Sequence, residues 1–348
     1  MKRFVSAFFS FICVFILIFS GYSTTSIAAP KTYVIVIDPG HGGIGDRNLG
    51  AQYNGFSEKE LTLMVANAMK AELEKYDNVS VYLTRETDTI VGLDTRAAIA
   101  KNLGADFVFS IHFNASSEHL YYGSEIWTSA FGSYYQKGYD FGQIASNELA
   151  SLGLYQKGVK TKIGNSGKDY YGIIRNCVAR GIPCDIIEHC YLDHAYDVQH
   201  LSQKDFCTKL GVSDATAVAK YFKLKSSSTG ADYSAYSYKS VKKPAGTVYH
   251  DTTDPDTCQI KTLAYDSTSR NVLVEMTTKD KQSPIIYFSY SYDGGTTFSP
   301  LQMWDRTKET QSFNVKIPAS VKTSKIVCRA YNSYELFTQS NEVTIETR

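Results

Sequence analysis

The first half of the chain alternates between short apolar runs and longer segments that are predicted to be helices. The apolar runs are rich in β-branched and aromatic residues, which is typical of buried strands, and they lie at 33–37, 79–84, 106–111, 123–128 and 184–188. The predicted helices between and after them span 58–75, 94–103, 134–151 and 202–222. This alternation predicts an α/β fold with a mostly parallel sheet covered by helices on both faces.

The pattern changes after residue 224. Residues 225–246 are rich in Ser, Tyr and Lys and have no apolar periodicity, which predicts a linker. Short alternating runs then follow at 259–265, 271–277, 285–292, 312–317, 325–331 and 341–345. Short strands separated by turns predict a β-sandwich of the immunoglobulin or fibronectin type. We therefore expect an α/β domain over 31–224 and a C-terminal all-β domain over 247–348.

The N-terminus has the pattern of a targeting segment. Lys2 and Arg3 precede an apolar run from 4 to about 19, and Ser26-Ile-Ala28 offers a cleavage site of small residues. We expect residues 1–28 to be a secretory signal peptide, with an uncleaved membrane anchor as the alternative. After cleavage the chain would have no stable membrane span and would be secreted.

Charge and cysteine content exclude few classes of partner and do not decide between disulfides and free thiols. Loss of Lys2 and Arg3 changes the formal net charge from +1 to −1, which gives no reason to expect nucleic acid as a partner. An exported chain may form disulfides, and six cysteines remain after cleavage, at 177, 184, 190, 207, 258 and 328. Their spacing matches no thiolate zinc site and does not reveal a pairing, so buried free thiols stay an equal alternative.

Three polar signatures each follow an apolar run in the first half. They are Asp38-Pro-Gly-His41-Gly-Gly, Ser110-Ile-His112-Phe-Asn114 and Asp185-Ile-Ile-Glu188. In an open α/β sheet, ligands bind outside the carboxyl ends of the strands. Two histidines and a glutamate are therefore expected to converge at one edge of the sheet, as a hydrolytic metal site requires.

Glu58 completes the expected ligand set. Ser57-Glu58-Lys59-Glu60 matches a capping box in which Glu60 reaches back to Ser57, so Glu58 is free to point from the helix N-terminus toward the same edge. Two histidines and one carboxylate with an open fourth position are typical of catalytic zinc, which activates water near neutral pH. His41, Glu58 and His112 are the candidate ligands, Glu188 is the candidate acid and base, and Asn114 could orient a substrate or a ligand.

Two other types of site compete with this interpretation. His189 and Cys190 permit a cysteine nucleophile, but neighbouring strand residues face opposite ways, so Glu188 and His189 cannot both face the site. The glycines at 40, 42 and 45 match the dinucleotide pattern G-x-G-x-x-G. That motif needs a helix that opens at the glycines, whereas the predicted helix begins only at about residue 57.

These residues resemble the zinc-dependent N-acetylmuramoyl-L-alanine amidases, peptidoglycan hydrolases of the autolysin type. The resemblance covers about 33–222 and rests on segments 37–43, 58–63, 83–88, 110–115 and 187–188, with Arg96. It implies that His41, Glu58 and His112 bind Zn²⁺ and that Glu188 is catalytic. It also implies a cell-wall location and cleavage of the amide between the lactyl group of N-acetylmuramic acid and L-alanine. One departure is the segment after Glu188, where His189-Cys190-Tyr191 replaces the usual Leu-Gly-Phe type.

Several roles stay open. Arg85 and Arg96 either hold loops by pairing with carboxylates or contact the stem peptide. A zinc peptidase that cuts within stem peptides, or a wall-binding protein without activity, are alternatives for the whole chain. In the C-terminal domain, Ser291-Tyr-Asp293-Gly-Gly-Thr-Thr-Phe298 predicts a turn stabilised by Asp293. That domain could contact wall glycan through exposed tyrosines and Trp304, act as a spacer, or cover the active site.

Overall fold

The computed structural model describes residues 31–43 and 48–347. Residues Thr32–Arg348 form one compact unit. The expected signal peptide, residues 1–28, lies outside the described residues. Within the part of the chain that is described, no helix combines the length and the apolar composition needed to cross a membrane.

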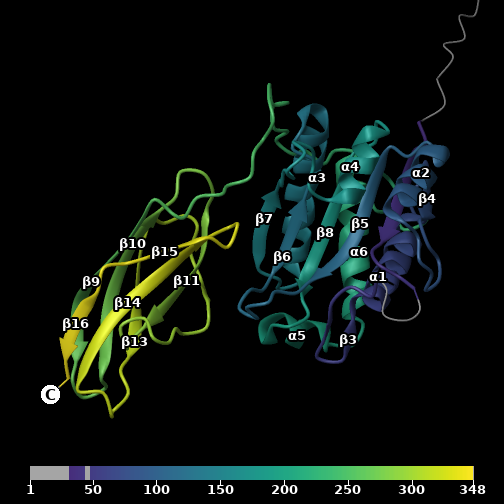
Figure 1. Ribbon diagram of the computed structural model, residues 1–348. Coiled ribbons are helices and arrows are strands. Elements are labelled where there is room, and N and C mark those ends of the chain that lie inside the picture. Colours follow the sequence, from purple (N-terminus) through teal and green to yellow (C-terminus); the bar gives the residue numbers. More distant parts are fainter. Residues whose placement is uncertain (1–30, 44–47, 348) are drawn as a thin grey trace, which may run out of the picture. The chain divides into compact units, whose positions relative to one another are not determined.

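A six-stranded sheet lies at the centre of the first half (Figure 1), in the order β4-β1-β5-β8-β6-β7. Strands β4, β1, β5 and β8 run parallel, whereas β6 is antiparallel to β8 and parallel to β7. The prediction of a mostly parallel sheet is therefore confirmed. The strands are β1 (Tyr33–Pro39), β4 (Val79–Leu83), β5 (Phe107–Asn114), β6 (Ser124–Trp127), β7 (Gln156–Lys160) and β8 (Cys184–Tyr191).

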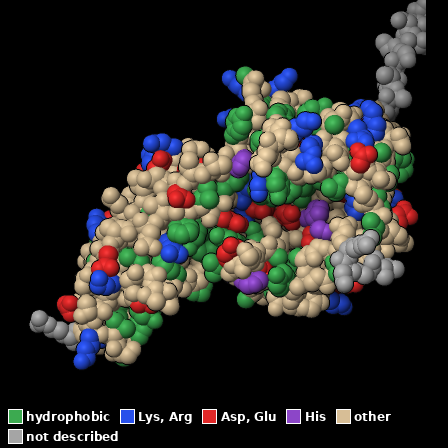
Figure 2. All heavy atoms as spheres, viewed as in Figure 1, with side chains coloured by type: hydrophobic (Ala, Val, Ile, Leu, Met, Phe, Trp, Pro, Cys, Tyr) green, Lys and Arg blue, Asp and Glu red, His purple; other side chains and the backbone are tan. Residues whose placement is uncertain are grey.

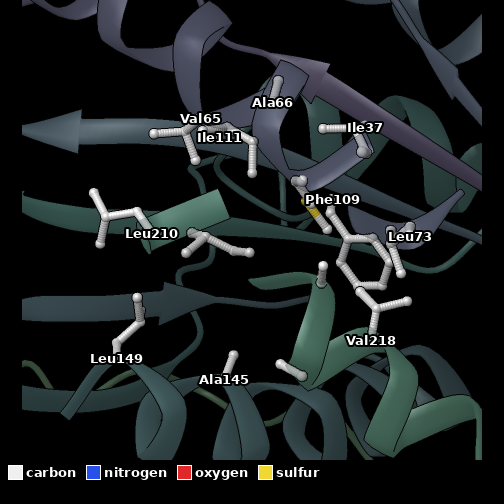
Figure 3. Packing of buried hydrophobic residues seen from close by; sticks show 14 of the residues in the cluster. Ile37, Val65, Ala66, Leu73, Phe109, Ile111, Ala145, Leu149, Leu210 and Val218 are labelled. Atoms are coloured by element: carbon white, nitrogen blue, oxygen red, sulfur yellow. The ribbon is translucent and has the colours of Figure 1, made fainter. Parts of the chain in front are cut away.

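Helices cover both faces of this sheet, as the sequence predicts. Strand β1 shows the reason, because Ile35 and Ile37 are buried in one hydrophobic cluster and Val36 in another. The first cluster includes residues of α1 (Glu58–Leu73), α3 (Gly132–Ser151) and α6 (Phe206–Phe222), and Figure 3 shows part of it. The second cluster includes residues of α2 (Leu93–Leu103) and α4 (Gly172–Ala179).

The predicted start of the first helix at Glu58 is confirmed, whereas its predicted capping box and the predicted start of the last helix at Ser202 are wrong. Ser57 is the N-cap residue of α1, but its side chain makes no capping bond and instead accepts a hydrogen bond from Gln52 Nε2 at 3.1 Å. A short hairpin of β2 (Gln52–Tyr53) and β3 (Phe56–Ser57) leads directly into the helix and replaces the capping box. Helix α6 begins at Phe206 because Ser202 already ends a separate helix, α5 (Ala195–Leu201).

Residues 225–246 contain no helix, and they pack on the first half of the chain. Tyr233, Tyr236 and Tyr238 lie against its larger hydrophobic cluster. Ser240 Oγ donates a hydrogen bond to Asp140 of α3, and Asp140 also accepts from the backbone amide of Val241 at 2.8 Å. The segment predicted as a linker therefore lies along the surface of the α/β domain.

The C-terminal strands form two antiparallel sheets, with the order β13-β10-β9 in one and β12-β11-β14-β15 in the other, where β16 also pairs with β14. Buried residues of both sheets, such as Val274 and Phe288, share one hydrophobic cluster. The predicted β-sandwich is thus confirmed. The strands are β9 (Thr257–Asp266), β10 (Asn271–Lys279), β11 (Ile285–Ser291), β12 (Gln302–Met303), β13 (Thr310–Lys316), β14 (Thr323–Asn332), β15 (Phe337–Gln339) and β16 (Val343–Glu346).

Trp304 is not exposed, which corrects one expectation for this domain. It is 3% exposed, packs against Phe288 in the sandwich core, and donates its indole N–H to the carbonyl of Lys308 at 2.9 Å. Contact with cell-wall glycan through residues 247–348 therefore cannot rest on this side chain. Asp293 does stabilise a turn, because its carboxylate accepts hydrogen bonds from the backbone amide and the hydroxyl of Thr297.

The six described cysteines are all buried and carry free thiols. The sequence left disulfides and buried free thiols open as alternatives, and the structure favours buried free thiols. Burial also raises the pKa of the thiol of Cys190, which keeps it in the neutral form.

Asp185 gives this fold a specific pH dependence. Its carboxyl group is fully buried, and burial outweighs the effect of the Thr128 hydroxyl and raises the pKa of Asp185 to about 8. Between about pH 4 and pH 8, the folded chain holds a proton there that the unfolded chain lacks. Stability should therefore fall as pH rises, by about 1.4 kcal/mol per pH unit from this group.

We expect Asp185→Asn to flatten this dependence, because the amide does not ionise. Urea unfolding at several values between pH 5 and pH 8 measures it, with Asp94→Asn at an exposed position as the control. The same slope in wild type and Asp185→Asn would show that Asp185 does not titrate in this range.

Candidate metal centre

Three side chains meet at one oxygen atom beside the sheet. Glu58 Oε1 lies 3.1 Å from His41 Nε2 and 3.0 Å from His112 Nδ1. His41 follows β1, Glu58 is the first residue of α1, and His112 lies within β5. The ligand atoms of the three lie within 4.8 Å of one another. The structure therefore brings together the three residues that the sequence suggested as ligands.

Backbone groups hold the Glu58 carboxylate, which is 3% exposed. Oε2 accepts a hydrogen bond from the amide of Ala51 at 2.7 Å, and Oε1 accepts one from the amide of Phe113 at 3.1 Å. Burial alone would raise the pKa of Glu58, but its hydrogen bonds with His112 and His41 outweigh burial and lower the pKa to about 2. Glu58 is therefore an ionised carboxylate, the form that binds a cation.

Glycines make room for this packing. A Cβ atom at Gly40 would lie 2.4 Å from the ring of His112, and one at Gly50 would lie 2.4 Å from Glu58 Oε2. Gly50 also has a φ of +73°, which side chains rarely adopt. Larger residues at either position would displace a candidate ligand.

Two buried arginines hold the loop that carries His41. Arg96 donates hydrogen bonds to the carbonyl of His41 at 2.5 Å and to the Asp38 carboxylate at 2.7 Å. Arg85 donates to the carbonyls of Pro39 at 2.9 Å and Gly40 at 2.8 Å. Both arginines are at most 3% exposed, so their placement favours the loop-holding role over contact with a substrate.

The donor set fits a zinc ion. Two imidazole nitrogens and one carboxylate oxygen are ligands that zinc accepts, and three protein ligands leave a fourth position open. Ligands about 2.0–2.1 Å from a tetrahedral zinc lie roughly 3.3 Å apart, close to the two distances from Glu58 Oε1. The three residues are the one group of histidine, cysteine and acidic side chains with this geometry in the described residues.

Glu188 lies on the same face of the sheet as His112. It pairs with His112 of β5 on one side and with Glu125 of β6 on the other, and paired residues on neighbouring strands share a face. Its side chain is half-buried, and its Oε2 atom has no hydrogen-bond partner. Burial raises the pKa of Glu188 well above its usual range, and the carboxylates of Glu58 and Glu125 add to this effect.

His189 lies on the opposite face of β8. It is fully buried, with Nε2 2.9 Å from Asp214 Oδ2 of α6 and Nδ1 3.1 Å from the carbonyl of His112. The strand-alternation argument against a histidine and cysteine pair at the site therefore agrees with the structure. A dinucleotide loop is not supported either, because among the described residues the first helix after Gly40 and Gly42 begins at Glu58.

A β-bulge brings Tyr191 to the face of Glu188. Across β5 and β8, His112 pairs with Glu188 but Asn114 pairs with Tyr191, so β8 contains one extra residue. Tyr191 and Asn114 line the same pocket as Glu188. The segment after Glu188, where the sequence departs from the pattern of the family that it resembles, thus supplies Tyr191 to the pocket wall.

Glu125 is the centre of a buried polar network beside Glu188. It is 3% exposed, and its oxygens accept hydrogen bonds from Asn114 Nδ2 at 2.9 Å, Trp127 Nε1 at 3.1 Å and Lys160 Nζ at 2.6 Å. Lys157 Nζ lies 3.2 Å from Glu125 Oε2. Burial would raise the pKa of Glu125, but the two lysines outweigh it and lower the pKa to about 2. Figure 2 shows acidic and histidine side chains gathered in a hollow of the face in view.

Sequence reasoning missed this network. Glu125 and Trp127 belong to a run predicted as a strand, but no motif marks them. Lys157 and Lys160 lie in β7, a strand that the sequence pattern does not predict. The one available signal is Glu125 itself, an acidic residue in an otherwise apolar run of a buried sheet.

Comparisons with known proteins cover the α/β half. Residues 35–220 match the model of the family described as N-acetylmuramoyl-L-alanine amidase. A sporulation-specific N-acetylmuramoyl-L-alanine amidase of Bacillus subtilis is 30% identical over 205 residues, which cover 57% of this chain and 72% of that protein. The amidase CwlM of Bacillus licheniformis is 30% identical over 197 residues, or 55% of this chain and 69% of that protein. Among solved structures, Cwp6 from Clostridium difficile matches 55% of this chain and 30% of its own length, with 26% identity and a TM-score of 0.51.

We expect Gly50→Ala to weaken metal binding by about 10- to 100-fold, because the new Cβ would displace Glu58 or His41. Gly55→Ala is the matched control, since Gly55 has a φ of +79° and a Cβ atom added there would have no neighbour within 4 Å. Both variants should lose roughly 1–2 kcal/mol of stability from the left-handed backbone. Titration calorimetry with zinc chloride and thermal unfolding separate the two effects. Equal zinc affinity in both variants would contradict the assigned geometry.

Proposed function

The chain belongs to the N-acetylmuramoyl-L-alanine amidase family. We therefore propose that it is a secreted, zinc-dependent amidase that acts on peptidoglycan. The bond cleaved is the amide between the lactyl group of N-acetylmuramic acid and L-alanine of the stem peptide. The observation that carries the proposal is the approach of His41 and His112 to one oxygen of Glu58, with Glu188 on the same face of the sheet.

His41, Glu58 and His112 would hold the zinc ion. A bound zinc ion polarises a carbonyl group and makes water a stronger nucleophile near neutral pH. The buried Glu58 carboxylate contributes the negative charge, and the two imidazoles contribute neutral nitrogen donors. Arg85 and Arg96 act indirectly, because their hydrogen bonds fix the loop from which His41 projects.

Glu188 would move the proton. As a carboxylate it accepts a proton from the attacking water, and as the acid it delivers that proton to the nitrogen of the departing L-alanine. The raised pKa of Glu188 suits a group that must hold a proton during part of the reaction. Asn114 lines the same pocket and is fixed by its hydrogen bond to Glu125, so its amide is in a position to orient the substrate.

Digestion of purified peptidoglycan tests the reaction. We expect zinc-loaded protein to release stem peptides with free L-alanine amino termini and to leave N-acetylmuramic acid intact, as identified by mass spectrometry. New termini within the stem peptide would instead indicate a zinc peptidase, and no release of peptide would indicate a wall-binding protein.

Variants in the same assay test Glu188. Glu188→Gln should bind zinc as wild type does and lose activity by about 10²- to 10⁴-fold, because the amide cannot carry the proton. Glu86→Gln, at an exposed position outside the site, should keep normal activity. A normal rate in Glu188→Gln would remove this residue from the mechanism.

We also propose that residues 1–28 are removed on export and that the protein acts outside the cell at the wall. The support is the sequence pattern of Lys2, Arg3 and the apolar run that follows. The intact mass of the protein recovered from the wall or medium fraction should correspond to a chain that starts at Ala29. A full-length mass in the membrane fraction would indicate an uncleaved anchor.

A further inference from the structure

The two halves of the chain share a buried aromatic contact. Tyr121, Tyr122 and Tyr191 of the α/β half form one hydrophobic cluster with Tyr287 and Tyr331 of the sandwich. The hydroxyl of Tyr287 donates a hydrogen bond to the carbonyl of Tyr122, and the hydroxyl of Tyr155 donates one to the carbonyl of Ile286. Tyrosines whose rings are buried and whose hydroxyl groups find hydrogen-bond partners are enriched at interfaces.

A turn of the sandwich reaches from this contact into the pocket of Glu188. The pocket has a volume of about 450 Å³, and residues 334–336, between β14 and β15, line it together with Glu188 and Asn114. Asn332 stiffens the turn, because its side-chain oxygen accepts hydrogen bonds from the amides of Tyr334 at 3.0 Å and Leu336 at 3.1 Å. The pocket wall is therefore shared between two parts of the sequence that lie far apart.

Glu335 is the residue in this turn that joins the buried network. Its carboxylate accepts hydrogen bonds from Lys157 Nζ and, at 2.9 Å, from the hydroxyl of Tyr191. Lys157 is 1% exposed and also contacts Glu125. The α/β half alone supplies two buried lysines and one buried glutamate to this network. Glu335 supplies the second carboxylate, so that the charges balance.

The backbone conformation of Glu335 is a second observation that points to a role for its side chain. Its φ is +68°, in the left-handed region that favours glycine or asparagine. Glutamate has no local advantage in such a turn. A side chain kept in an unfavourable backbone conformation suggests a role that outweighs the strain, and the interactions of this side chain in the pocket are those with Lys157 and with the hydroxyl of Tyr191.

We propose that Glu335 of the C-terminal domain is a positioning residue of the amidase site, an inference that rests on the proposed function. Glu335 gives Lys157 a second carboxylate besides Glu125, so that Oε1 of Glu125 keeps its hydrogen bonds from Asn114 and Trp127 beside Glu188. Lys157 and Lys160 both contact Oε2 of Glu125, and without Glu335 this one carboxylate would have to balance both buried cations, which is costly. Glu125 is then drawn toward Lys157, and the pocket wall loses its geometry. The C-terminal domain thus completes the active site and is more than a tether.

A double-mutant cycle between Glu335→Gln and Lys157→Met tests this on the full zinc-loaded chain. Each single variant should lower kcat/KM on solubilised peptidoglycan at least ten-fold while zinc content stays at the wild-type level. The kcat/KM of the double variant should be no lower than that of the less active single variant, because both substitutions remove the same contact between Glu335 and Lys157. Glu309→Gln, at an exposed ion pair of the same domain, is the control and should be neutral.

Hydrogen exchange provides a readout that does not depend on activity. In Glu335→Gln, peptides that span 112–127 and 156–162 should exchange faster than in wild type, and Glu309→Gln should not show this. Unchanged kcat/KM and unchanged exchange in Glu335→Gln, or additive losses in the cycle, would overturn the proposal. If wild type releases no L-alanine termini but exchange still responds, the positioning role stands and the proposed reaction fails.

Discussion

The buried carboxylate of Glu58 is the constraint on which the arrangement of the site depends. A carboxylate taken out of water is costly unless donors or a cation surround it. The amides of Ala51 and Phe113 supply two hydrogen bonds, and the imidazoles of His41 and His112 face the same oxygen. These four partners come from three segments: Ala51 from the residues before the β2–β3 hairpin, His112 and Phe113 from strand β5, and His41 from the loop after β1. The requirement to satisfy one carboxylate therefore fixes three segments relative to one another.

A second buried carboxylate, Glu125, organises the neighbouring pocket in the same way. It gathers Asn114, Trp127 and two lysines on the face of the sheet that carries Glu188. The two carboxylates differ in their partners. Glu58 contacts two imidazoles, which can bind a metal ion together with it, whereas Glu125 contacts two lysine ammonium groups, which cannot bind a metal ion. On the sheet, Glu188 lies between His112, which contacts Glu58, and Glu125, and burial together with the carboxylates of Glu58 and Glu125 raises the pKa of Glu188. In the proposed mechanism, this contrast would separate the carboxylate that holds the metal from the carboxylate that moves the proton.

Local sequence patterns were sufficient for the layers of the fold and for the residues that gather at the candidate metal centre. Strands such as β1 are buried on both faces and read as continuous apolar runs, and His41, Glu58 and His112 stand next to such runs or at a helix start. The bulge in β8 could not be predicted, because its signal is a pairing between strands and not a residue type. The capping box at Ser57 failed because a hairpin of only four paired residues took over the helix entry.

Long-range contacts were also beyond local patterns. Lys157 and Glu335 are 178 residues apart in the sequence, and neither belongs to a motif. Trp304 was expected at the surface because large aromatic residues often serve glycan binding, but it fills the core of a small sandwich. The contact between Lys157 and Glu335 and the burial of Trp304 both depend on which strands and helices pack together. They cannot be predicted before the order of the strands in the sheets is known.

X-ray absorption spectroscopy at the zinc edge tests the central claim most directly, with full-length protein loaded with one equivalent of zinc. We predict one tightly bound zinc ion per chain whose nearest neighbours are nitrogen and oxygen atoms at about 2.0–2.1 Å, including two imidazoles. Sulfur neighbours at about 2.3 Å would show that the cysteines hold the metal instead. That result, or the absence of tightly bound zinc, would contradict the account.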